Sequence, residues 1–494
     1  MIVQAPFLVV GIPLFTALLM GSIGIYKPSW VRIFGLVGII FATFNAILLF
    51  NDVLTHGDKV HYFFGGWEAP FGIGIEYVVD HLNALMILLI YVVSFFAFIY
   101  SLKSVEFEIP KSKHTYYYTL YFLLIAGLVG ITITGDAFNL YVLFEICALS
   151  SYSLLALGGR RAYLATFFYL LIGSIGACFY LIGIGYLFIK TGTLNMAHLF
   201  NLIPAVYLAK SILIGFIFIN VGLFIKMALF PLHGWLPNTY SVAPISTTCL
   251  LAPLGTKLSI YIMMRFYFNV FSPEFVYEVL NIQSAMVWLS TIAIFIGSIY
   301  AIYHTSYRKI ITFIVVAEIG YIVGGIWIGH PESLMAAIYH ILADSLMTMS
   351  LFMIAGMLLF YLKSDNIAVF SKAFKQLPVT SVALIIVFAS IVGVPPTSGF
   401  FSKLYLIKGA FQMGHYQFIV ALLVSSLTAL FLFFRFFESY FFQSETELIT
   451  NGRIKESKRL AIPLLSISAG IIVLGVTCNY WFQYIMNIIP KGLR

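Results

Sequence analysis

Seven ionisable residues lie inside long apolar stretches of this sequence, where a charge is costly to hold. They are Glu145, Lys226, Lys257, Glu318, His340, Asp344 and Lys403. A charge near the centre of a bilayer costs about 2.5–3.5 kcal/mol on insertion scales, so such residues are candidates for function. Lysine suits proton transfer because burial weakens its hold on the proton and a nearby carboxylate restores it. A row of lysines, carboxylates and a histidine therefore predicts a switchable proton relay.

Two proline-rich segments lie close to two of these lysines and predict broken helices. The segment 230–237 (FPLHGWLP) begins four residues after Lys226, and the segment 393–399 (GVPPTSG) ends four residues before Lys403. Proline removes a backbone donor and blocks the preceding helical turn. Such backbone persists at membrane depth only inside protein or beside a water-filled cavity. Matching broken helices in two halves of a chain point to a transport site between inverted repeats.

The spacing of the buried charges also indicates two halves. Glu145 precedes Lys226 by 81 positions (226 − 145), and Glu318 precedes Lys403 by 85 positions (403 − 318). Glu318 is therefore predicted to be the second half's counterpart of Glu145, near the route to Lys403. The simpler alternative for Glu145 and Lys226 is a fixed ion pair that ties helices together.

Three polar residues, His340 among them, also have simpler interpretations. Asp136 is expected at a helix end, where a carboxylate is cheap, and Arg265 is expected to extend from a span end to the interface. His340 lies one helical turn before Asp344, on the same face, and by itself it is also compatible with a hydrogen-bonded core histidine.

Composition requires a membrane around this chain. Of its 494 residues, 61% are hydrophobic and only 9% are charged, against about 25% charged in a soluble domain. A helix needs about 20 apolar residues to cross the hydrocarbon, which gives about fourteen spans. They are 2–24, 30–50, 78–102, 116–133, 137–157, 163–189, 211–231, 240–268, 285–303, 308–328, 334–361, 379–411 (interrupted), 417–443 and 460–489. The longest loop is predicted from Asn51 to Tyr77.

Loop charges predict the orientation. Lysines and arginines concentrate in the loops that follow odd-numbered spans, which places those loops in the cytoplasm. Both termini are then expected outside the cytoplasm, in agreement with an even number of spans. The N-terminal residues lack a basic region and a cleavage site, so they predict a first membrane helix and not a cleaved signal. The net charge of +8 is interpreted as loop charge, not as a nucleic-acid surface.

The four cysteines form no CxxC pair, so neither a disulfide nor a metal or iron–sulfur site is predicted. We expect no cofactor in this chain, and no redox or hydrolytic chemistry of its own.

Four motifs resemble one family of membrane subunits. They are GDAFNLYVLFEICALSSY (135–152), KMALFPLHGWLPNTYSVAP (226–244), LLAPLGTKLSIYIMMRF (250–266) and GVPPTSGFFSK (393–403). They look like the antiporter-like subunits of respiratory complex I. They look closer still to the D subunit of multisubunit (Mrp-type) cation/proton antiporters and its equivalents in membrane-bound hydrogenases and sulfur-reducing complexes. The resemblance covers roughly residues 110–415.

This resemblance implies an all-α membrane protein of fourteen helices, with two inverted five-helix repeats and broken seventh and twelfth helices. The expected divisions are an N-terminal segment (1–110), the two repeats (111–268 and 285–443) and a C-terminal loop and helix (444–494). The resemblance further implies that Glu145 pairs with Lys226, that Lys257 is the central relay, and that Lys403 gates the far side. His340 matches a family histidine between Lys257 and Lys403.

The sequence departs from the family pattern in three places. Glu318 stands where histidine or glutamine is expected, Asp344 where many members have a second histidine, and Thr348 where several have another lysine. The more acidic centre leaves open a different proton wire or a site that tolerates sodium. The sequence ends soon after its last span, without the long lateral helix of the distal complex I subunit.

The function that we predict is proton translocation by a subunit of a larger complex in a prokaryotic cell membrane. Its expected partners are other membrane subunits, small hydrophobic ones among them, and in some complexes a second antiporter-like subunit. The alternatives are sodium/proton exchange through this chain, a structural scaffold without an ion path, and a stand-alone solute carrier. The sequence does not distinguish an antiporter from a hydrogenase or a quinone-linked pump.

Overall fold

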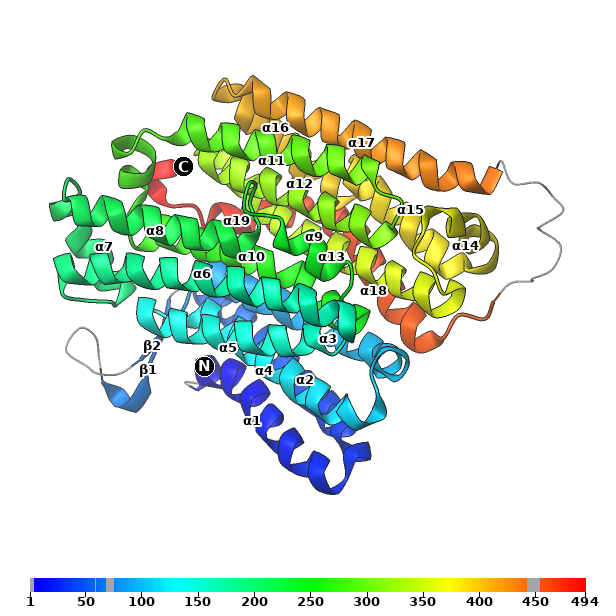
Figure 1. The fold of residues 1–494 in the computed structure, drawn as a ribbon. Helices are drawn as coiled ribbons and strands as arrows, with labels where there is room; N and C mark the ends of the chain where they lie inside the picture. The colour runs from blue at the N-terminus through cyan, green and yellow to red at the C-terminus, as the bar shows by residue number, and fades with distance from the viewer. Residues whose placement is uncertain (1–3, 58, 68–74, 442–453) are drawn as a thin grey trace.

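The computed structural model is a bundle of long, nearly parallel helices, and it describes residues 4–57, 59–67, 75–441 and 454–494 (Figure 1). Thirteen helices among these residues are long and apolar enough to cross a membrane. They are α1 (Ala5–Tyr26), α2 (Val31–His56), α3 (His81–Glu108), α4 (His114–Ile133), α5 (Ala137–Ala156), α6 (Arg160–Thr191), α8 (Lys210–Met227), α10 (Ile245–Asn269), α11 (Gln283–Tyr303), α12 (Tyr307–Ile328), α13 (Pro331–Leu362), α17 (Tyr416–Phe441) and α18 (Lys458–Val476). The half-helices α15 (Pro378–Val392) and α16 (Ser398–Gln412) form a fourteenth crossing, so the predicted fold class is confirmed.

Both predicted helix breaks are present. Helix α8 ends at Met227, and after a non-helical segment the chain resumes as the short helix α9 (Trp235–Tyr240). Residues 393–397 separate α15 from α16. The structure also has a third break, which was not predicted. At Thr477 the last span divides into α18 and α19 (Cys478–Met486).

The loop predicted from Asn51 to Tyr77 is shorter than expected and partly ordered. Helix α2 continues to His56, and strands β1 (Val60–Phe63) and β2 (Glu76–Val79) then pair antiparallel, with Val60 opposite Val79. Part of this prediction, residues 68–74, lies outside the described residues.

Matching contacts at opposite ends of the bundle support the two inverted repeats. Asp136, before α5, bridges Asn195, while Ser306, before α12, bridges Asn366. Each bridge adjoins a short lateral helix, α7 (Met196–Leu202) or α14 (Phe370–Gln376). Figure 1 shows α7 at the left end and α14 at the right end. The residue limits of the repeats remain a prediction.

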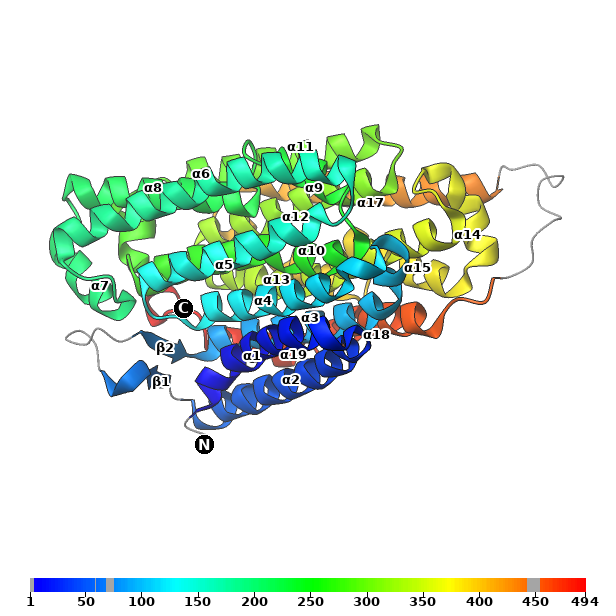
Figure 2. The ribbon, with the colours of Figure 1, turned by 60° about the horizontal axis from the view of Figure 1, so that its bottom comes forward.

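Helices α10, α12 and α13 form the centre of the bundle. Every residue in the apolar window of α12 is buried, and 94% of that of α10, against 39% for α1. Figure 2 shows α1 and α2 along one edge of the molecule. Lys257, Glu318, His340 and Asp344 all lie on the three central helices, so their charges are shielded from lipid.

Two carboxylates from distant parts of the chain hold the starts of membrane helices. Glu108 accepts the backbone N–H groups of Ile245 (2.7 Å) and Ser246 (2.9 Å) at the start of α10. Glu456 accepts those of Val379 (2.7 Å) and Thr380 (3.2 Å) at the start of α15. Carboxylates are favourable there because the first N–H groups of a helix have no partner within the helix.

Candidate functional site: a line of buried charges

Lys257 and Asp344 form an ion pair at the centre of the protein. The Lys257 Nζ atom lies 2.7 Å from Asp344 Oδ2, and the lysine side chain is 0% exposed. The other carboxylate oxygen, Oδ1, accepts the hydroxyl of Thr348 at 2.8 Å, and Lys257 also donates to that hydroxyl at 3.4 Å. Both carboxylate oxygens of Asp344 are therefore occupied.

His340 connects Glu318 to the broken helix. Its Nδ1 atom lies 2.8 Å from the hydroxyl oxygen of Ser402, which also lies 3.0 Å from the carbonyl oxygen of Gly399. The other ring nitrogen, Nε2, faces Glu318 Oε2 across 2.5 Å. A hydrogen bond at this distance places one proton between the imidazole and the carboxyl group, whichever of the two carries it.

Lys403 belongs to half-helix α16, and its ammonium lies at the C-terminal end of half-helix α15. Its ammonium donates to the carbonyl of Ile391, in the last turn of α15, and to the hydroxyl of Ser426 at 2.9 Å. It also lies 5.0 Å from the ring centroid of Tyr321. A cation is favourable at this position because the last carbonyls of a helix have no partner and carry partial negative charge.

Lys226 and Glu145 are not in contact. Lys226 lies in the last turn of α8, and its Nζ atom stands 5.5 Å from the ring centroid of Phe144. No ion pair joins it to Glu145 within the described chain, although Glu145 lies within electrostatic reach. The direct pair that the family resemblance implies is absent from the described contacts, and the Phe144 ring lies beside the ammonium.

A small cavity lies between Lys226 and helix α10. It measures about 40 Å³ and is bordered by Lys226, Trp235, Gly255 and Ser259 among others. A water molecule needs roughly 10–15 Å³ of such volume and two or more polar partners. The cavity can therefore hold water beside Lys226, on the side that faces α10.

The structure thus brings most of the predicted residues into one line. Lys257 and Asp344 are in contact. One turn away on α13, His340 joins Glu318 to Ser402. Ser402 is followed in the chain by Lys403. No hydrogen bond between Asp344 and His340 is formed in the described structure, and none joins Lys226 to Lys257. A continuous route along this line would need water or a side-chain movement at these two gaps.

Glu318 is only approximately the counterpart of Glu145. Both stand on the second helix of their repeat, but Glu145 follows the bridging residue Asp136 by 9 positions (145 − 136), and Glu318 follows Ser306 by 12 (318 − 306). Glu318 is 2% exposed and reaches Lys403 through His340 and Ser402. Glu318 therefore lies close to Lys403, as predicted. Compared with Glu145 in the first repeat, it stands about one turn further along its helix.

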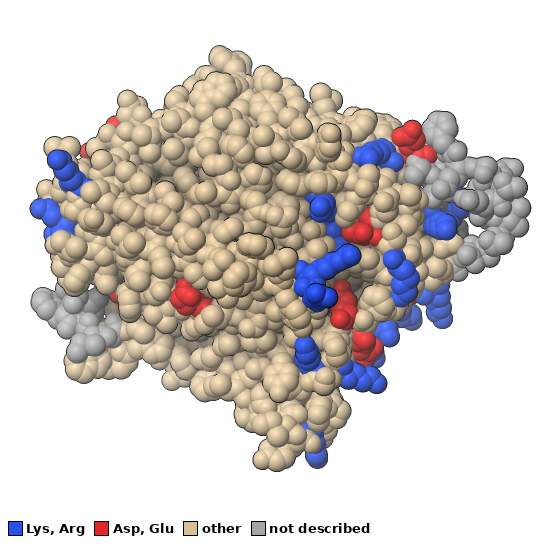
Figure 3. Space-filling view, viewed as in Figure 1, with Lys and Arg blue, Asp and Glu red and all other residues tan. Residues whose placement is uncertain are grey.

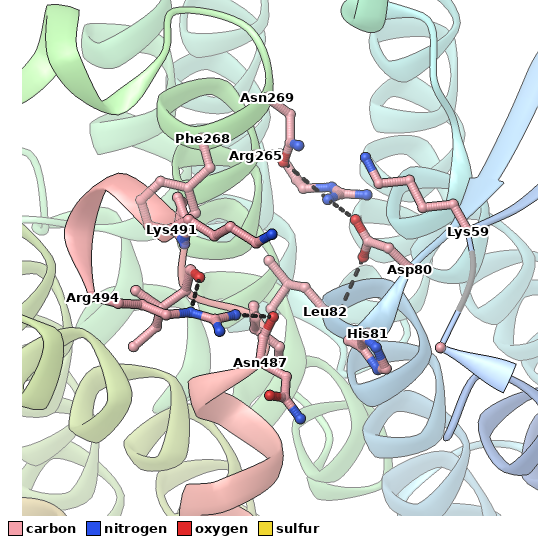
Figure 4. Close-up of a pocket in the computed structure, with 14 residues that line it drawn as sticks. Lys59, Asp80, His81, Leu82, Arg265, Phe268, Asn269, Asn487, Lys491 and Arg494 are labelled. Atoms are coloured by element: carbon pink, nitrogen blue, oxygen red, sulfur yellow. Dashed lines mark hydrogen bonds and ion pairs between the residues drawn. The ribbon is translucent and has the colours of Figure 1, made fainter. Parts of the chain in front are cut away.

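Arg265 was predicted to extend to the interface, but its side chain instead stays inside the protein. It forms an ion pair with Asp80 at 2.5 Å and donates to the side chain of Asn83. Burial by itself raises the pKa of Asp80, but Arg265 and the N–H of Asn83 outweigh it and lower that pKa below its ordinary value. Figure 4 shows this pair in a pocket of about 430 Å³ that Lys59, Lys491 and other residues also line. Arg265 stays inside because the start of helix α3 supplies a carboxylate there.

Asp136 lies at a helix end, as expected. Its carboxylate accepts the N–H groups of Phe138 (2.9 Å) and Asn139 (2.7 Å) at the start of α5. Burial raises the pKa of this carboxyl group above its ordinary value. Asp136 therefore has a structural role at the start of α5.

Sequence reasoning missed the hydroxyl groups of the site. Ser402 directly precedes Lys403, so its position could have been noticed. Ser426 and Tyr321 lie on other helices, and no sequence signal links them to Lys403.

The family description "NADH:quinone oxidoreductase/Mrp antiporter, TM" matches residues 134–429. NADH-quinone oxidoreductase subunit N of Desulforudis audaxviator (strain MP104C) is 34% identical, over 100% of this chain and 99% of its own length. The D subunit of the Na(+)/H(+) antiporter of Bacillus subtilis (strain 168) is 31% identical, over 81% of this chain and 79% of its own length.

A solved structure of the membrane-bound sulfane sulfur reductase, an archaeal respiratory membrane complex, contains a similar chain. The TM-score is 0.88 at 28% identity, over 98% of this chain and 97% of that one. The sequence matches and the fold agree, so this chain belongs to the family of transmembrane subunits shared by NADH:quinone oxidoreductases and Mrp antiporters.

Proposed function

We propose that this antiporter-like subunit translocates protons along Lys226, Lys257, His340 and Lys403, with Glu145, Glu318 and Asp344 as counter-charges. The main support is the short contact between His340 Nε2 and Glu318 Oε2, at 2.5 Å. This pair lies between the Lys257–Asp344 ion pair and Lys403, so a proton that leaves it has a lysine on either side.

The charges of this cluster support transfer of one proton at a time. Lys257 and Lys403 contribute two positive charges, and Asp344 and Glu318 contribute two negative ones when His340 is neutral. A proton that enters this balanced cluster therefore adds one positive charge. Such a charge has few counter-ions in a low-dielectric interior and is readily passed on.

The geometry favours protons over sodium. Sodium requires several free oxygen ligands, whereas one oxygen of Asp344 is ion-paired with Lys257 and the other accepts the hydroxyl of Thr348. The scaffold alternative explains the Lys257–Asp344 pair. It does not explain Lys403, whose described contacts include no carboxylate.

The surface charge supports an orientation. Figure 3 shows most lysines and arginines of the visible face at the right end of the bundle, near α14 and α15. We propose that this end faces the cytoplasm and that both termini lie outside it. The partners would be other membrane subunits of an Mrp-like or complex I-like assembly, and this chain is proposed to hold no cofactor.

Proton uptake into liposomes that contain the purified complex tests the proposal. Lys257→Met should abolish uptake, whereas Lys210→Met, at an exposed helix start, should leave it unchanged. If Lys257→Met prevents assembly, the double variant Lys257→Met/Asp344→Asn removes both charges of the pair and avoids an unpaired buried carboxylate. Wild-type uptake by either assembled variant would refute the proposal, and uptake that requires sodium would favour exchange.

A further inference from the structure

The break in the twelfth crossing lies near the middle of that crossing, and its backbone is exposed on the outer surface of this chain. Half-helices α15 and α16 have 15 residues each, which is about 22 Å on either side at 1.5 Å per residue. Between them, Val394 is 45% exposed, and Pro395 and Pro396 are exposed as well.

Lipid cannot cover such a break. The prolines bring no N–H group, and in the described part of the chain no donor bonds the carbonyl of Pro395. Non-helical backbone at membrane depth is tolerated only where protein or a water-filled cavity covers it. Something other than hydrocarbon must therefore lie against residues 394–396.

The last helix pair runs beside this break and brings polar groups to the same level. Gly475 of α18 packs so closely that a Cβ atom there would lie 1.9 Å from the carbonyl oxygen of Pro396. Asn479 and Gln483 follow on α19, beyond the break at Thr477, four and eight residues after Gly475. At 1.5 Å per residue their depths differ from that of Gly475 by at most about 6 and 12 Å. Both positions fall within the half-thickness of the hydrocarbon, which is about 15 Å.

Asn479 and Gln483 share one face of α19 because they are spaced four residues apart, and Asn487 follows at the same spacing as the residue that caps the helix. All three are exposed, whereas Phe482, on the adjoining face, packs against Tyr339 and Tyr405. Apart from a 3.9 Å contact from Cys478 Sγ to Asn479, the carboxamides of Asn479 and Gln483 form no hydrogen bond to any described residue. In Figure 4 the carboxamide of Asn487 points away from Arg494.

Other outer faces of the bundle differ from this one. On α1 the exposed large side chains in the middle of the helix are Leu14, Phe15, Leu18 and Leu19, which suit lipid. The exposed hydroxyl of Ser22 on the same helix bonds the carbonyl of Leu18 within the helix (3.3 Å). The unpaired carboxamides on α19 are therefore a feature of this surface and not of the bundle in general.

We propose that residues 394–396, Asn479 and Gln483 form a docking surface for one membrane-spanning helix of another subunit, and that this helix carries hydroxyl or carboxamide side chains. Carboxamides bond across helix pairs in membranes, and the spacing of four residues suits one helix that lies along α19. The same helix would cover the open backbone at residues 394–396. The inference does not depend on the proton path.

Cysteine cross-linking in the native complex tests this surface. Asn479→Cys and Gln483→Cys should cross-link to a different membrane subunit, and they should resist a water-soluble maleimide. Cross-links only to a second copy of this chain would overturn the proposal. Rapid maleimide labelling in the intact complex would also overturn it, because the surface would then line a water-filled cleft.

Assembly gives an independent test. Asn479→Leu/Gln483→Leu removes two interhelical hydrogen bonds, which corresponds to a roughly tenfold weaker association of the partner subunit. Ser22→Leu, the matched polar-to-apolar control, should have no effect. The thermal stability of this chain itself should not fall, because neither carboxamide bonds within it. Full retention of every subunit in the double variant would refute the inference.

Discussion

Asp344→Asn is the most informative substitution in the central ion pair. Asparagine has the shape of aspartate and can still accept the hydroxyl of Thr348, but it removes the charge that lies 2.7 Å from Lys257. The cavity left behind is negligible, so the effect isolates the electrostatic contribution of the carboxylate.

The magnitude follows from the burial of the pair. Removal of one partner of a buried ion pair costs about 3–5 kcal/mol, because the other charge is left without compensation. Lys257 avoids this cost only if it releases its proton. An energy of this size corresponds to a factor of about 2 × 10² to 5 × 10³ in an equilibrium constant. We therefore expect the proton-translocation rate to fall about a hundredfold.

The assay is proton uptake by the complex in liposomes, measured with a pH-sensitive dye at equal subunit content. The wild type is compared with Asp344→Asn, Lys257→Met and the double variant, and the melting temperature of each complex is recorded. Lys257→Met/Asp344→Asn should be less destabilised than the sum of the single variants, with a coupling of about 3 kcal/mol. A wild-type rate in Asp344→Asn, or strictly additive destabilisation, would refute the reasoning.

Three other predictions concern carboxylates outside this pair. Glu318→Gln should reduce proton uptake at least tenfold without loss of assembly. Glu332→Gln, at a partly exposed side chain, should leave uptake unchanged. Equal uptake in both variants would count against a role for Glu318. Glu108→Gln weakens the cap on the start of α10 and should lower the free energy of unfolding by about 1–2 kcal/mol, seen as a lower melting temperature with unchanged uptake per assembled complex. The lowered pKa of Asp80 contributes stability at neutral pH that is lost as the pH falls through that pKa. Asp80→Asn should therefore destabilise the protein at pH 7 and differ less from the wild type below about pH 4. A stability difference that does not depend on pH would contradict the Arg265 pairing.

The sequence alone determined the membrane architecture and the candidate residues. Hydropathy located the crossings because a helix in lipid must be apolar along its length. Prolines located two breaks because their effect on the backbone is local. The third break, at Thr477, has no proline and was missed. It lies where α18 packs through Gly475 against the broken twelfth crossing.

Only the tertiary structure decided which charges meet. Asp344 pairs with Lys257, and Glu318 with His340, although 87 and 22 positions separate these partners (344 − 257 and 340 − 318). Helical periodicity predicts which residues share a face, as it did for His340 and Asp344. It does not predict the rotation and depth of one helix against another. Those depend on packing across the whole bundle, and at Lys226 packing placed an aromatic ring beside the ammonium instead of Glu145.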